Sequence, residues 1–181
     1  NYSIEDSGLI ADKNPLNEKS KRFIEGVYEI IEGNEIFGDL AVVKSTNDYF
    51  SLFCKKNEAY FILKSGEKDT NFYFEGSWRY SRSSTNGKIA LNILKKSGGK
   101  EAFLNTSNKT NLVINGYYGS EFQNLASSFK AKYLRQLNPD SSFNIIAHRG
   151  GGRNSDRLPA SENSLELIKI AEYFGANSVE I

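Results

Sequence analysis

The single histidine of the chain, His148, is followed directly by Arg149 and by a run of glycines at positions 150–152. An imidazole can give or take a proton near neutral pH, and a guanidinium offers a planar fork of donors that matches phosphate oxygens. The apolar run before them, residues 143–147, is typical of a buried parallel strand. In barrels of alternating strands and helices, catalytic side chains lie at the carboxyl ends of strands. The pattern therefore predicts proton transfer and phosphate binding at a strand end.

The residues after this loop predict the elements that would hold it in place. Asn163 is the expected N-cap of a helix, with Glu166 three positions further on in the spacing of a capping box. Gly175 is the expected end of that helix, and residues 177–181 begin a second strand. Residues 143–181 thus predict the strand–helix–strand unit of a parallel sheet.

Three motifs in this region resemble the start of the glycerophosphodiester phosphodiesterase family: residues 146–150 (IAHRG), 161–164 (SENS) and 175–181 (GANSVEI). In that family a His-Arg-Gly sequence ends the first strand of a (β/α)₈ barrel of the TIM type. A Pro-Glu-Asn-Thr-like sequence opens the first helix, and a Glu-x-Asp pair ends the second strand. Ser161 and Ser164 stand where the family has proline and threonine, and both are mild departures.

The resemblance implies roles for four residues. His148 matches the first catalytic histidine, and Arg149 matches the catalytic arginine that binds phosphate. Glu162 matches the supporting catalytic glutamate, and Glu180 matches the first metal ligand, which would hold a divalent cation, Mg²⁺ or Ca²⁺. In the parent enzyme the cation would neutralise the phosphate, and His148 would transfer a proton.

The resemblance is incomplete in two respects. The loop carries Arg153 and Arg157, which could reach substrate anions, although loop arginines are more often simply solvated. A complete barrel of this type takes about 250 residues, and the family's second carboxylate would be the residue after Ile181. We therefore expect residues 1–181 alone to bind a cation only very weakly and to hydrolyse nothing, and the full-length parent to be the enzyme.

Residues 22–119 follow a different pattern, in which aromatic and β-branched residues alternate with polar ones. The expected strands are residues 23–31, 35–44, 49–55, 59–64, 72–80, 88–94, 101–104 and 112–117. Short loops rich in Gly, Asn, Asp and Ser separate them, so the sequence predicts an antiparallel meander and a mainly β fold class. Closure into an eight-stranded barrel would remove both exposed edges, and a two-sheet sandwich is the alternative. The pattern resembles that of small lipocalin-like barrels.

The segments on either side of this β domain are expected to be connecting structure. Residues 1–21 are mostly polar and predict a tether. Residues 120–142 predict a helical linker, because apolar residues fall three or four positions apart within residues 121–136 and a break follows at residues 138–142.

The composition excludes several classes of partner. A net charge of +1 predicts no binding to nucleic acid, and no apolar run approaches the ~20 residues of a transmembrane helix. The single cysteine, Cys54, precludes an internal disulfide and is expected to be a buried apolar filler. The polar start without methionine fits an exported protein or lipoprotein that has lost its signal segment, or an experimentally chosen starting point. We expect an extracytoplasmic location.

These observations lead to two hypotheses of function. The first is a metal-dependent hydrolase of glycerophosphodiesters or related lipid head-group diesters, acting on a small-molecule phosphodiester, with the β domain as an accessory domain. The second is a non-catalytic ligand- or glycan-binding barrel with a vestigial phosphodiesterase tail, in which aromatic residues line a cavity. Residues 143–181 alone would leave strand edges and an apolar helix face uncovered. We expect them to be poorly ordered, packed on the β domain, or exchanged with a neighbouring chain in a packed or domain-swapped oligomer.

Overall fold

The computed structural model describes residues 9–106, 109–120, 124–137, 146–152, 160–173 and 176–181. The described residues up to Leu137 and those from Ile146 onward belong to two separate compact units. Helices in the described part of the chain are too short or too polar to cross a bilayer.

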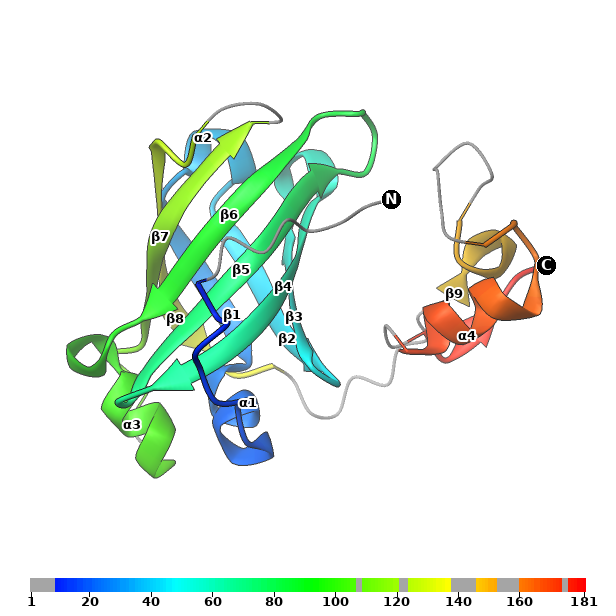
Figure 1. The fold of residues 1–181 in the computed structure, drawn as a ribbon. Coiled ribbons are helices and arrows are strands. Elements are labelled where there is room, and N and C mark those ends of the chain that lie inside the picture. Colours follow the sequence, from blue (N-terminus) through cyan, green and yellow to red (C-terminus); the bar gives the residue numbers. More distant parts are fainter. Residues whose placement is uncertain (1–8, 107–108, 121–123, 138–145, 153–159, 174–175) are drawn as a thin grey trace. The chain divides into compact units, whose positions relative to one another are not determined.

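The first unit is a closed barrel of antiparallel strands, in which every strand pairs with its neighbours in sequence and β1 also pairs with β8 (Figure 1). The strands are β1 (Gly26–Glu32), β2 (Leu40–Thr46), β3 (Tyr49–Cys54), β4 (Ala59–Lys68), β5 (Asn71–Tyr80), β6 (Asn86–Ile93), β7 (Val113–Ser120) and β8 (Ser127–Arg135). The predicted mainly β class and the predicted eight-stranded antiparallel barrel are confirmed, and the sandwich alternative is wrong.

The β4–β5 hairpin shows why these residues form strands. Side chains alternate along β4, so that Phe61 and Leu63 are buried in the barrel while Tyr60 is turned outward. The ladder runs without interruption to a two-residue turn, in which Asp69 and Thr70 both have positive φ angles, 54° and 63°. Such turns match the twist of the flanking strands and fix the register of a hairpin.

The prediction of a helical linker over residues 120–142 was wrong, and the barrel extends beyond the predicted limit at residue 119. Residues 127–135 form β8, which pairs with both β7 and β1. Phe129 and Ala131 are buried on the inner face, with exposed or half-exposed residues between them. Without β8, the strands β1 and β7 would each have an edge of unpaired backbone groups. Pairing of these groups with β8 stabilises the strand more than the helical spacing of its apolar residues stabilises a helix.

The predicted strand at residues 101–104 was also wrong, because this segment is the helix α3 (Gly99–Leu104). Gly98 enters it with a left-handed φ of 95°, and the following Lys-Glu-Ala-Phe-Leu sequence consists mostly of good helix formers. The buried Ala102 accepts a hydrogen bond at its carbonyl from the Ser20 hydroxyl, at 3.3 Å. Eight strands were predicted and the barrel has eight, because the wrongly predicted strand at residues 101–104 offsets the unpredicted strand β8.

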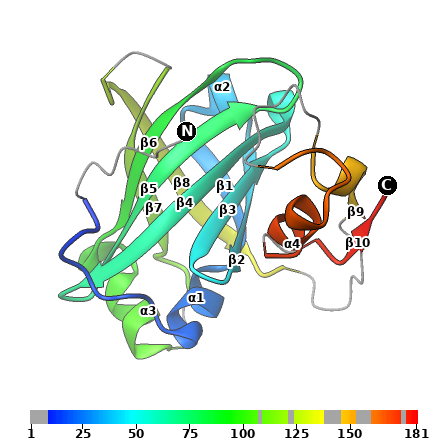
Figure 2. The ribbon, with the colours of Figure 1, turned by 45° about the vertical axis from the view of Figure 1, so that its right-hand side comes forward.

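The predicted tether at residues 1–21 is structured over its described C-terminal part. Helix α1 (Glu18–Ile24) begins after Asn17, whose side chain accepts a hydrogen bond from the backbone of Ser20 at 2.9 Å. Leu16 is buried, and Asn14 forms a bridge with Glu67 of β4. Helices α1 and α3 lie at the same end of the barrel (Figures 1 and 2).

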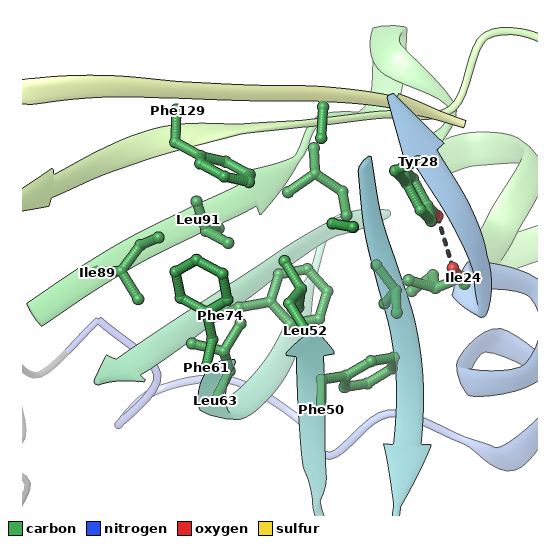
Figure 3. Close-up of a cluster of buried hydrophobic side chains, with 14 of the residues drawn as sticks. Ile24, Tyr28, Phe50, Leu52, Phe61, Leu63, Phe74, Ile89, Leu91 and Phe129 are labelled. Atoms are coloured by element: carbon green, nitrogen blue, oxygen red, sulfur yellow. Dashed lines mark hydrogen bonds between the residues drawn. The ribbon is translucent and has the colours of Figure 1, made fainter. Parts of the chain in front are cut away.

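The opposite end of the barrel is closed by a short helix, α2 (Asn34–Phe37), where the sequence predicted the start of a strand at residue 35. The fully buried ring of Phe37 lies at 4.9–5.8 Å, between ring centroids, from four other rings of the core. These are the rings of Phe61, Trp78, Tyr118 and Phe129. Figure 3 shows the neighbouring part of this core, where side chains from opposite walls meet and the buried Tyr28 hydroxyl donates to the Ile24 carbonyl at 2.5 Å. These side chains belong to one continuous cluster of buried apolar residues.

We expect Phe37→Ala to lower the free energy of unfolding of the barrel by about 3–5 kcal/mol, because it empties the contact point of four rings. Urea denaturation followed by tryptophan fluorescence measures this change, since Trp78 lies in the same cluster. The control is Phe103→Ala on α3, an exposed side chain whose loss should cost less than about 1 kcal/mol. Equal losses for the two variants would contradict the role of Phe37.

Cys54 is buried in the barrel, and this burial raises the pKa of its thiol to about 12. The nucleophilic thiolate is therefore scarce in the native state at pH 8. We expect an aromatic disulfide reagent to leave the native protein unmodified and to modify one thiol per chain in denaturant. Rapid native-state modification would contradict the buried placement, and no other cysteine can confuse the readout.

Candidate functional site

The second unit contains the predicted strand–helix–strand order. Strand β9 (Ile146–Ala147) and strand β10 (Ser178–Val179) pair in parallel, and helix α4 (Leu165–Tyr173) lies between them in the sequence. The backbone N–H of Glu180 donates to the Ala147 carbonyl, and the N–H of Gly150 donates to the Glu180 carbonyl, both at 3.0 Å. Residues that follow the two strands are thereby held at one edge of the pair.

His148 and Glu180 meet at this edge. The Nε2 atom of His148 lies 3.8 Å from Oε1 of Glu180, and both side chains are exposed. An imidazole beside a carboxylate can exchange protons with a ligand while the carboxylate orients the ring or binds a cation. The two residues that the sequence placed at successive strand ends are thus neighbours in space.

Arg149 and Glu162 form a second contact in the same unit. The Nη1 atom of Arg149 lies 3.4 Å from each carboxylate oxygen of Glu162, whose side chain is more buried than that of the arginine. The exposed guanidinium retains donors for a further anion, because it carries five N–H groups. Glu162 therefore orients Arg149, and the supporting catalytic role expected for it stays a prediction.

Backbone geometry sets the direction of these side chains. Arg149 has a left-handed φ of 53°, which is uncommon for a residue with a β-carbon, and its carbonyl accepts from the Asn163 N–H at 2.9 Å. Gly150 is buried with a φ of 72°, and a β-carbon there would lie 3.2 Å from both Cα and N of Asn163. The turn at residues 148–150 (η3, His148–Gly150) is thus fastened to the segment before α4.

The predicted N-cap of α4 was wrong by one residue. Asn163 has a left-handed φ of 59°, and the Oγ atom of Ser164 accepts the N–H of Leu167 at 3.2 Å. Asn163 instead serves the turn, through its bond to the carbonyl of Arg149. Asn163 and Ser164 are both residue types that cap helices, and the three-residue spacing from Asn163 to Glu166 favoured Asn163, which is not the cap.

The structure brings together four of the six predicted site residues in pairs: His148 with Glu180, and Arg149 with Glu162. Arg153 and Arg157 lie outside the described residues. Within the described ranges, no three His, Cys, Asp or Glu side chains are grouped to hold a metal ion. Glu180 supplies one carboxylate where Mg²⁺ or Ca²⁺ requires six or more oxygen ligands, so its role as a ligand stays a prediction.

Sequence reasoning missed the fastening of this turn by Gly150 and Asn163. The run of consecutive glycines was the available signal, since a buried glycine with positive φ permits a close approach of two backbone segments. In this unit Ile146, Leu165 and Ile181 also remain exposed. The expectation that residues 143–181 pack on the β domain or exchange with a neighbouring chain stays a prediction.

The aromatic residues of the barrel strands, which would line a cavity in the second hypothesis, occupy three different environments. Trp78, Phe74 and Tyr118 are buried in the core, and the Trp78 indole N–H donates to the Gly119 carbonyl at 3.1 Å. Tyr80, partly buried, packs against that core. Tyr73 and Tyr117 belong to the outer wall, where Lys13 lies over the Tyr73 ring at 4.5 Å.

Comparisons of this chain with protein-family models, with curated proteins and with solved structures give no match. The arguments about function therefore rest on the residues and on the geometry of the site.

We expect Gly150→Ala to displace the turn that carries His148, because the added β-carbon meets the Asn163 backbone at a strained φ. His148 is the only histidine, so its imidazole resonances report on this turn alone. They should shift in Gly150→Ala and stay unchanged in Gly38→Ala, a glycine with positive φ in the barrel unit. An unchanged His148 spectrum in Gly150→Ala would contradict the proposed fastening.

Proposed function

We propose that this chain belongs to a metal-dependent phosphoric diester hydrolase that acts on glycerophosphodiesters or related lipid head-group diesters. The observation that carries the proposal is the contact between His148 and Glu180, at 3.8 Å, beside the Arg149–Glu162 pair at the end of a parallel strand. A proton carrier, a phosphate ligand and a carboxylate for a cation are the three functions that this reaction needs.

Arg149 is the phosphate ligand in this scheme. Its guanidinium is oriented from one side by Glu162 and is exposed on the other, so it can bind a non-bridging phosphate oxygen. An ion pair at this level of exposure contributes little to stability, which leaves Arg149 free to exchange part of its contact for an anionic substrate.

His148 is the proton carrier. Its side chain is exposed, and the imidazole can deliver a proton to the leaving oxygen of a diester or remove one from the attacking nucleophile. Glu180 can orient the imidazole, and it is the described carboxylate that would hold the cation. A bound Mg²⁺ or Ca²⁺ would supply charge neutralisation at the phosphate, and its remaining ligands would be waters, substrate and residues outside the described ranges.

The barrel is assigned the role of an accessory domain. Its core is a continuous cluster of buried side chains, which includes Phe37, Phe61 and Trp78. In that cluster these aromatic rings contact one another, which supports a packing role for them over the cavity-lining role of the alternative hypothesis.

The proposal is tested by hydrolysis of glycerophosphocholine by the full-length protein that contains this chain. His148→Ala and Arg149→Ala should each lower kcat/KM by at least about 10²-fold, and a chelator should abolish activity. The control is Lys169→Ala on the exposed side of α4, which should leave activity unchanged. Full activity of His148→Ala, or activity that the chelator does not affect, would overturn the proposal.

A further inference from the structure

The outer wall of the barrel carries an apolar surface on two neighbouring strands. Leu40 and Val42 of β2 and Phe53 of β3 have 41%, 38% and 50% of their surface exposed. Val42 lies directly opposite Phe53 in the ladder, and Leu40 is the next outward residue along β2. We name these three residues the β2–β3 patch. Its members are adjacent and exposed, unlike single surface residues, which need no explanation.

Opposite charges flank this patch on the two sides of β2. Glu29 of β1 lies directly opposite Leu40. On the β3 side, Lys55 directly follows Cys54, which pairs with Ala41 next to Leu40, and it is the first residue beyond the strand. Both side chains are exposed, and neither makes an ion pair or side-chain hydrogen bond with the residues that the structure describes. The acid thus lies on the β1 side of β2 and the base on the β3 side.

We propose that this wall is the interface of a homodimer, in which a second copy of the chain packs on the β2–β3 patch. A half-turn about an axis along β2 places β1 of one copy over β3 of the other. Leu40 and Val42 then meet their own counterparts, and Glu29 of each copy faces Lys55 of the other. A two-fold interface must be self-complementary in this manner, and the acid and the base on opposite sides of β2 meet that requirement.

The same charges argue against other occupants of this wall. An anionic lipid surface would be repelled by Glu29, which stands beside Leu40 at the centre of the wall. The barrel is convex, so contact is confined to β2 and its two neighbouring strands. Such a small contact belongs to the low end of protein interfaces, and we expect a dissociation constant on the order of micromolar.

The association is tested by sedimentation velocity of the chain over a wide concentration range. The wild type should show a monomer–dimer equilibrium, and Phe53→Lys should weaken it at least about tenfold by burying a charge. The matched control is Tyr117→Lys on β7, where an aromatic side chain of similar exposure, 57%, lies outside the patch. It should leave the equilibrium unchanged. A chain that remains monomeric, or a dimer insensitive to Phe53→Lys, would overturn the proposal.

Charge reversal tests the geometry of the dimer independently of the apolar contact. Glu29→Lys and Lys55→Glu should each weaken association about tenfold, because like charges then face each other in both symmetric pairs. The double variant should restore the wild-type constant. Both side chains are exposed, so we expect the charge-reversal variants to fold. They therefore test the dimer even if Phe53→Lys fails to fold. A double variant as weak as the two single variants would overturn the proposed axis.

Discussion

Two backbone hydrogen bonds hold the candidate site together: Glu180 N–H to the Ala147 carbonyl, and Gly150 N–H to the Glu180 carbonyl. They continue the parallel register of β9 and β10 beyond the strands themselves, so that His148 and Glu180 come to one edge. Parallel strands need a long connection, and here it is the segment that contains Glu162, Asn163 and α4. The connection therefore supplies both the sheet pairing and the partner of Arg149.

The barrel depends on an analogous constraint of closure. Its first and seventh strands would each present unpaired backbone groups if β8 did not pair with both of them. Once closed, the barrel needs caps at its ends, and α2 supplies one by inserting Phe37 into the ring cluster. The same closure leaves a convex outer wall, and Leu40, Val42 and Phe53 of the β2–β3 patch are exposed on it.

The sequence predicted the strands best where the local hydrophobic pattern and the packing of the complete barrel favour the same element. Buried residues alternate with more exposed ones throughout β3 and β6 and over the first part of β4 and β5, and all four strands were predicted, although β4 continues four residues past its predicted end. In β8 the inward residues Phe129 and Ala131 also alternate, yet nearby Leu125 and Leu134 add a helical spacing that favoured the wrong element. This segment is a strand because it pairs with both β1 and β7 and closes the barrel. That requirement exists only once all the other strands are in place.

The candidate site was predictable in its residue types but not in its local geometry. The strand–loop–helix–strand order was sufficient to predict that His148 and Glu180 would come to one edge. The left-handed conformation of Arg149 and the cap at Ser164 were not predictable, because each depends on where the turn at Gly150 meets Asn163. Contacts between backbone segments distant in sequence leave no periodic signal in either segment.

The proposal that His148 and Glu180 together form a cation-binding edge is tested most directly by Mn²⁺ titration of the chain, followed at the His148 imidazole resonances. Paramagnetic broadening reports a nearby ion even when binding is weak and transient. The account predicts that His148 broadens early in the titration, that Glu180→Gln removes the effect, and that Glu166→Gln on α4 retains it. A His148 signal that stays sharp, or that broadens equally in Glu180→Gln, would contradict it.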